Sequence, residues 1–169
     1  NDNPQMSRKI AHLAVLLAKV RTGVMRNQYN HKVEGYEPTH EGPGRVAKQL
    51  YTLAHGISMS HGTYNDINGS TYRLIKKVTR DSMPPFRLAI LEAIFFAQGK
   101  LSTSDLCEKL KIGQTDLKLH IEDIQLCNII DYHAVCTPNR AGRPHKKWFI
   151  EPRTLESILA CGIFDGDYI

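Results

Sequence analysis

The sequence predicts a mainly α protein with one β-hairpin, folded in two parts. Apolar residues recur at helical spacing along most of the chain, whereas residues 129–150 are rich in β-branched and aromatic side chains on either side of a turn. Between the two parts stands Met83-Pro84-Pro85, which ends a helix because proline cannot continue the hydrogen-bond ladder. We therefore expect a helical bundle over residues 1–83 and a second domain over residues 84–169.

The first part shows three helical patterns. One runs from Ser7 to Met25, the next starts near Arg45 and stops before Gly62, and the last begins at Ser70, the expected N-cap. The expected inward residues are Ile10, Leu13, Ala14, Leu17, Val20 and Val24, then Val46, Leu50, Leu53, Ala54 and Ile57, then Tyr72, Ile75 and Val78. The outward residues of the third helix are Arg73, Lys76, Lys77 and Arg80.

A long loop separates the first two helices. Residues 27–44 contain three glycines and two prolines, which break any regular pattern. At about 18 residues the loop exceeds the connections usual in compact domains, so we expect it to be a functional or inserted segment.

The second part reads as helix, helix, turn, helix, strand, loop, strand and a final helix. This order is that of a helix-turn-helix with a β-hairpin wing. The expected elements are Phe86–Ala97, a helix opened by the N-cap Ser102 with Asp105, Gln114–Leu126, Ile129–Thr137, the turn 138–144, Lys146–Ile150 and Arg153–Ala160. The expected inward residues are Phe86, Ala89, Ile90, Ala93, Ile94 and Ala97, then Leu106, Leu110 and Ile112, then Leu117, His120, Ile121 and Ile124, then Leu155, Ile158 and Leu159.

Residues 86–150 resemble the winged helix-turn-helix domains of many prokaryotic regulators. The run "LSTSDLCEKLKIGQTDLKLHIEDIQLCNIIDY" follows their usual order of a helix, a recognition helix and the start of the wing. The resemblance implies a DNA-binding fold, although winged helices also serve as protein-docking modules.

Two groups of residues are candidates for contact with DNA. A recognition helix presents its N-terminal outward residues to the major groove, and here these are Gln114, Thr115 and Lys118. Its acids Asp116, Glu122 and Asp123 oppose a polyanion. The wing is more favourable, because residues 139–147 contain no acid and Arg is suited to a minor groove or backbone. Its candidate contacts are Arg140, Arg143, His145, Lys146 and Lys147.

The net charge of +5 lies mostly in the first part. Residues 1–82 hold twelve Lys and Arg against six Asp and Glu, for a net charge of +6, whereas residues 83–169 hold ten against eleven, for −1. A basic balance is compatible with nucleic acid as a partner.

The segment "GPGRVAKQLYTLAHGISMSHGTYNDINGSTYRLIKKVTRDSMPP", preceded by "SRKIAHLAVLLAKVRTGV", resembles the helical lid of AAA+ ATPases of the MoxR and MCM helicase kind. The resemblance implies that Arg45 is the sensor-2 arginine, which reaches the nucleotide γ-phosphate. The chain has no G-x-x-x-x-G-K-[ST] loop, so ATP and Mg²⁺ would be bound only by a separate ATPase core. The resemblance implies that the chain is the C-terminal part of a larger P-loop ATPase, and its opening without methionine is compatible with a piece of a longer protein.

Enzymatic and metal sites are not indicated. None of the four cysteines forms a C-x-x-C pair, and the nearest zinc set, Cys127, His133, Cys136 and His145, places two members on opposite faces of a strand. Tyr29, His31 and Glu34 are polar loop residues, not a known catalytic set. No apolar stretch is long enough for a membrane span and no secretory signal is present, so we expect a cytoplasmic protein without cofactor or enzymatic activity of its own.

Three functions follow in order of preference. The first is binding of DNA, most readily double-stranded, through the wing and recognition helix. The second is a protein-interaction module that uses the acidic face of the third helix, Asp116, Glu122 and Asp123, and regulates an NTPase. The third is a free-standing transcription regulator with the N-terminal helices as a dimerisation unit. A stable dimer would indicate the regulator, and a monomer the lid fragment.

Overall fold

The computed structural model describes residues 3–34, 38, 41–62, 67–135 and 145–166. Over these residues the protein is mainly helical, with seven helices and one three-stranded antiparallel sheet. The chain forms two compact units, each built from separate segments. Unit 1 comprises Asn1–Thr22, His40–Pro84 and Arg153–Ile169, and unit 2 comprises Gly23–Thr39 and Pro85–Pro152. This division differs from the predicted one, because the last helix joins unit 1 and residues 23–39 join unit 2.

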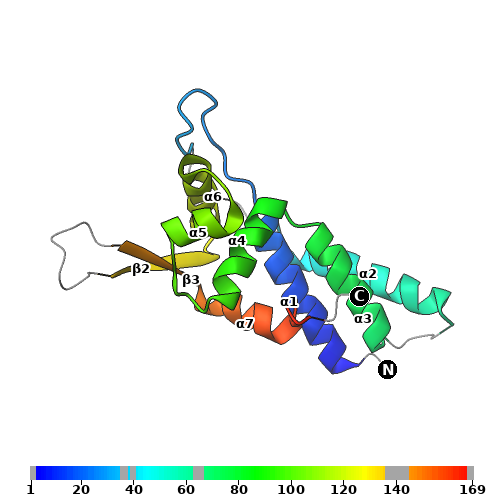
Figure 1. Cartoon of the computed structure of the whole chain (residues 1–169). Coiled ribbons are helices and arrows are strands. Elements are labelled where there is room, and N and C mark those ends of the chain that lie inside the picture. Colours follow the sequence, from blue (N-terminus) through cyan, green and yellow to red (C-terminus); the bar gives the residue numbers. More distant parts are fainter. Residues whose placement is uncertain (1–2, 35–37, 39–40, 63–66, 136–144, 167–169) are drawn as a thin grey trace. The chain divides into compact units, whose positions relative to one another are not determined.

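Unit 1 is a bundle of helices built around α1 (Pro4–Arg21), seven residues of which are buried (Figure 1). Helices α2 (Pro43–Ser60) and α3 (Gly69–Asp81) pack on α1. Helix α7 (Pro152–Cys161) joins them through polar contacts: Lys19 Nζ donates to Thr154 Oγ1 at 3.0 Å, and Tyr72 Oη donates to the Cys161 carbonyl at 2.6 Å. These contacts link residues 89 or more positions apart, which explains why helical periodicity did not assign α7 to this unit.

On α3 the predicted outward residues Arg73 and Lys77 are exposed, whereas the prediction for Lys76 was wrong. Lys76, expected outside, is 5% exposed, because its Nζ donates to the Gly162 carbonyl at 3.2 Å beside the Tyr72 ring. The N-cap is Asn68, whose Oδ1 accepts from Thr71 N at 2.9 Å, and Ser70 donates to that same oxygen. Four side chains that were expected to face the core are instead exposed to solvent: Leu53, Val78, Phe86 and Leu159.

Unit 2 contains three helices and the sheet. Its elements are α4 (Pro85–Phe96), β1 (Leu101–Ser102), α5 (Thr103–Leu110), α6 (Gln114–Leu126), β2 (Ile130–Val135) and β3 (His145–Ile150). The strand order is β1-β3-β2, with Tyr132 opposite Trp148 and His133 opposite Lys147. The sequence did not predict β1, because a strand of two residues carries no periodicity. Gly99 ends the turn that precedes β1 with φ 72°, and a Cβ added there would lie 3.1 Å from Phe149 Cβ.

The inner face of the sheet and the helices enclose one apolar core. Ile94 of α4, Leu106 of α5 and Leu117 of α6 are each at most 1% exposed, and Trp148 of β3 is buried with them. The indole N–H of Trp148 is hydrogen-bonded, because Nε1 donates to Thr103 Oγ1 at 3.0 Å. This core fixes which faces of α6 and of the strands remain outside.

The predicted loop 27–44 begins with an ordered hairpin, which we call the arm (residues 25–34). Helix α1 ends at Arg21, earlier than predicted, and the Thr22 hydroxyl donates to the Ala18 carbonyl at 2.8 Å. In the arm, Arg26 and Val33 form an antiparallel bridge, and Glu34 N donates to the Met25 carbonyl at 2.9 Å. The rest of the predicted loop contains residues outside the described ranges.

The capping box predicted for α5 is confirmed. Asp105 N donates to Ser102 Oγ at 3.3 Å, and Ser102 N donates to Asp105 Oδ2 at 2.8 Å. The hydrogen bonds from Ser102, aided by the charge of Lys147, hold the pKa of Asp105 below its usual value. Because the pKa of Asp105 is lower in the folded chain than in the unfolded chain, its ionised carboxylate stabilises the fold at pH values above the unfolded pKa of about 3.9. This stabilisation is lost as the pH falls through the folded pKa.

We predict that Ser102→Ala lowers the free energy of unfolding by about 1 kcal/mol at neutral pH, since a cap hydrogen bond is lost. The difference from the parent chain should shrink as the pH falls from the unfolded pKa of about 3.9 through the lower pKa of folded Asp105, since the carboxyl then becomes protonated. Urea unfolding at several pH values measures both effects. Ser104→Ala, at an exposed serine of the same helix, is the control, and equal losses for the two variants would refute the capping account.

Candidate nucleic-acid interface

The first turn of α6 presents the predicted recognition residues to solvent. Gln114, Thr115 and Lys118 are all exposed, whereas Leu117 between them is fully buried. The N-cap is Gly113, which has no side chain to accept from the free amides of the first turn. Uncapped amides with the positive end of the helix dipole favour an anion, and the exposed side chains of Gln114, Thr115 and Lys118 add donors beside them, whereas Asp116 places one acid in the same turn.

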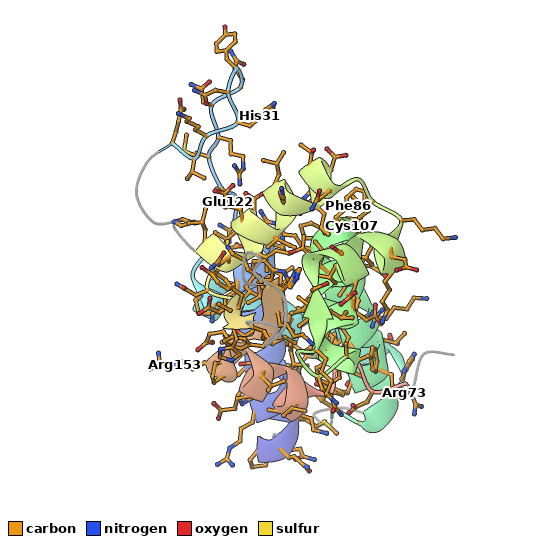
Figure 2. The ribbon with its side chains drawn as sticks, turned by 60° about the vertical axis from the view of Figure 1, so that its left-hand side comes forward. His31, Arg73, Phe86, Cys107, Glu122 and Arg153 are labelled. Atoms are coloured by element: carbon orange, nitrogen blue, oxygen red, sulfur yellow. The ribbon has the colours of Figure 1, made fainter. Side chains whose placement is uncertain are left out.

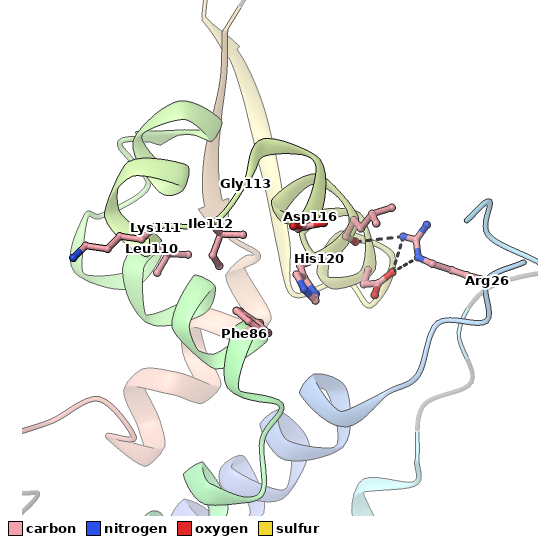
Figure 3. Close-up of a pocket in the computed structure, with 10 residues that line it drawn as sticks. Arg26, Phe86, Leu110, Lys111, Ile112, Gly113, Asp116 and His120 are labelled. Carbon is pink, nitrogen blue, oxygen red and sulfur yellow. Dashed lines mark hydrogen bonds and ion pairs between the residues drawn. The ribbon is translucent and has the colours of Figure 1, made fainter. Parts of the chain in front are cut away.

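The acids at the other end of α6 are held by Arg26 of the arm (Figure 3). Arg26 Nη2 lies 2.6 Å from Asp123 Oδ1 and 2.9 Å from Glu122 Oε2, and Nε also donates to Asp123 at 2.9 Å. The same guanidinium donates to the Leu119 carbonyl at 3.3 Å and to the His31 carbonyl at 2.7 Å. Arginine provides five donors in a planar fork, and all three nitrogens of the guanidinium take part in this contact.

The electrostatics of this network are those of a partly buried ion pair. The Arg26 and Asp123 side chains are only 15% and 17% exposed. Burial acts to lower the pKa of Arg26, but the hydrogen bonds and charges of Asp123 and Glu122 outweigh it and raise that pKa. Arg87 of α4 adds a second cation, 3.5 Å from Asp123 Oδ2. Two of the three acids that opposed DNA binding by α6 are therefore neutralised within unit 2.

The arginine network could not be predicted from the sequence alone. Arg26 and Asp123 lie 97 residues apart, and no local pattern links them. The only signal was the adjacent pair Glu122-Asp123 on one helix, which calls for a cation from elsewhere in the chain.

The β2–β3 hairpin separates the basic residues that are adjacent in sequence. Alternate residues of a strand point to opposite faces, so Lys146 shares a face with Trp148, whereas His145 and Lys147 share the other. Lys146 Nζ lies 3.9 Å from the centre of the Tyr132 ring and 5.7 Å from that of Trp148. This cation–π contact fixes an exposed ammonium group. The predicted contacts Arg140 and Arg143 lie outside the described residues.

A groove of about 660 Å³ runs between α5, α6 and the start of α4 (Figure 3). Phe86 stacks on His120 at its edge, with ring centres 5.1 Å apart, and is 52% exposed, so it does not lie in the core as predicted. Asp116, the third acid of α6, lines this groove with Lys111. Asp116 therefore lies on the flank of α6 that faces the groove, with Arg26 and Asp123.

The predicted sensor-2 residue Arg45 lies in unit 1, while the other predicted site residues belong to unit 2. Arg45 stands in the first turn of α2, its side chain is 74% exposed, and its Nε lies 3.6 Å from Glu41 Oε1. An exposed pair of this length at i, i+4 is weak and leaves the guanidinium accessible.

No protein-family model matches the chain, and neither a curated protein nor a solved structure matches it. Among the described residues, no group of three or more His, Cys, Asp or Glu side chains is arranged to hold a metal ion. No helix in the described part of the chain has the length and apolar character needed to cross a membrane.

We predict that Arg26→Ala lowers the free energy of unfolding of unit 2 by about 2 kcal/mol. The variant loses hydrogen bonds to charged groups, and the half-buried carboxylate of Asp123 loses Arg26, which lies nearer to it than Arg87 does. Arg45→Ala, which removes the longer and more exposed ion pair, should cost less than about 0.5 kcal/mol. Chemical denaturation with hydrogen-exchange mass spectrometry, which resolves the two units, measures the losses. Equal losses for both variants would contradict the role given to Arg26.

Proposed function

We propose that unit 2 is a winged helix that binds double-stranded DNA through the exposed face of α6 and the β2–β3 hairpin. The order α4-β1-α5-α6-β2-β3 supports this reading, since a winged helix places a short strand before its second helix and a β-hairpin after its third. In this assignment α6 is the recognition helix and the β2–β3 hairpin is the wing.

The proposal depends on one observation: near the C-terminal end of α6, Arg26 forms ion pairs with Glu122 and Asp123, and Arg87 forms a further one with Asp123. A recognition helix with net negative charge repels a polyanion, and these ion pairs remove most of that repulsion. At the N-terminal turn the exposed residues are Gln114, Thr115 and Lys118, together with one acid, Asp116, which lines the groove on the flank of α6.

Binding would proceed by electrostatic capture followed by local contacts. Lys118 and the first-turn amides of α6 would meet phosphates or base edges, and Gln114 can donate to and accept from a base. Lys146, held over Tyr132, would present its charge to the backbone with little loss of side-chain entropy. Lys147, His145 and the sequence-predicted Arg140 and Arg143 complete the proposed contacts. Affinity would fall steeply as the salt concentration rises.

Unit 1 fits the same proposal as the helical lid of a larger P-loop ATPase. ATP and Mg²⁺ would then be held by a separate core domain, and the exposed Arg45 would reach the γ-phosphate from the first turn of α2. The alternative of an acidic docking surface on α6 is less favourable, because Glu122 and Asp123 already bind Arg26.

We predict that the chain binds a labelled random duplex. A triple variant with Lys118→Ala, Lys146→Ala and Lys147→Ala should bind at least about 30-fold more weakly near 0.1 M salt. Loss of three phosphate contacts should also reduce the slope of log K against log salt by about 2 to 3. Fluorescence anisotropy at several salt concentrations gives both values, and circular dichroism checks that the variant is folded.

The matched control removes three positive charges from unit 1, with Arg45→Ala, Lys48→Ala and Lys77→Ala, all at exposed positions. It should retain most of the affinity. If control and test variants lose equal affinity, net charge and not this interface governs binding. If the parent chain binds neither duplex nor single strand at low salt, the proposed function is wrong. Single Lys146→Ala and Lys147→Ala variants identify which face of the hairpin meets DNA.

A further inference from the structure

The arm is held in one conformation by its own polar side chains. Asn27 Oδ1 accepts from the backbone N–H groups of Tyr29, at 2.9 Å, and of Asn30, at 3.3 Å. Asn30 Oδ1 in turn accepts from Lys32 N at 2.9 Å, and Asn27 N donates to the Lys32 carbonyl at the same distance. His31 takes the left-handed conformation, φ 55°, that closes the turn. Such Asx turns order a loop tip without burying it.

The base of the arm is fixed to one flank of α6. Arg26 contacts Leu119 and Asp123, whereas the neighbouring Gln125 donates to Asp131 of β2 at 3.4 Å. Residues two apart on a helix are separated by about 160° around its axis, so Asp123 and Gln125 lie on nearly opposite flanks, and Glu122, the other acid that Arg26 binds, lies between them. The exposed face of α6 is therefore bordered by β2 on one flank and by the arm on the other. In Figure 2, His31 marks the arm where it extends past Glu122.

The tip of the arm carries side chains suited to a nucleic-acid backbone. Tyr29 is 86% exposed, and His31 and Lys32 beside it are exposed as well. The one acid of the arm is Glu34 at its base, which accepts from Asn27 Nδ2, and residues 25–33 contain none. Tyrosine can stack on a sugar or base and donate its hydroxyl to a phosphate, and a lysine ammonium can pair with a phosphate.

We propose that the arm is a second DNA-contacting hairpin, with the Tyr29 hydroxyl and Lys32 ammonium meeting phosphates on the side of α6 opposite the β2–β3 hairpin. This inference rests on the proposed function and extends it: the duplex would be held from both flanks of the recognition helix. The Arg26 network then has two roles, because it removes negative charge from α6 and sets the position of the arm.

The test is the double variant Tyr29→Ala with Lys32→Ala in the full chain, titrated against the labelled duplex. We expect affinity to fall about three- to tenfold near 0.1 M salt and the salt slope to fall by about 1, with the unfolding transition unchanged. The control is Met59→Ala with Lys48→Ala, which removes an exposed large side chain and one charge from unit 1. Its affinity should stay within about twofold of the parent.

A photo-crosslinking residue at position 29 gives a direct readout. A crosslink between position 29 and the duplex, together with the loss of affinity, supports the arm as a contact. If the parent chain binds DNA while the Tyr29 and Lys32 variant binds equally well and no crosslink forms, the arm proposal is overturned and the proposed function stands. If the parent chain binds no DNA, both proposals fall together.

Discussion

The ion pair between Arg26 and Asp123, with Glu122 as the second acceptor, is the contact on which the candidate interface depends. It joins the segment that follows α1 to the C-terminal half of α6, 97 residues further along the chain. A guanidinium that is 15% exposed and satisfies two carboxylates and two carbonyls is costly to leave unpaired, so the arm stays with α6. The same contact cancels the charge that would otherwise keep a polyanion away from the helix.

Proximity in sequence and proximity in space differ throughout this molecule. Lys146 and Lys147 are neighbours, yet the pleat of β3 sends them to opposite faces, one over the Tyr132 ring and the other toward β1 and His133. Arg26 lies in a segment that links two helices of unit 1, yet it belongs to unit 2. The surface charge that a partner meets is thus set by strand alternation and long-range pairing.

Local physics made much of the fold predictable. Helical periodicity and the Ser102 cap located α5, α6 and most of α2 to within a few residues, since these elements depend on contacts a few positions apart. Periodicity failed where a distant segment packs on a helix. The helical pattern places Lys76 on the outer face of α3, but the side chain is buried and donates to the carbonyl of Gly162, which follows α7. The candidate residues Gln114 and Lys118 were predictable from their place in α6. The role of Arg26 was not, because an ion pair between distant segments leaves no periodic signal.

The most direct test of the central claim is a nuclear magnetic resonance titration of the labelled chain with a short random duplex. We expect the largest amide shifts on residues 114–118 of α6 and 145–147 of β3, both in unit 2. Shifts confined to unit 1, or no shifts at low salt, would contradict this claim and would remove α6 as the binding surface.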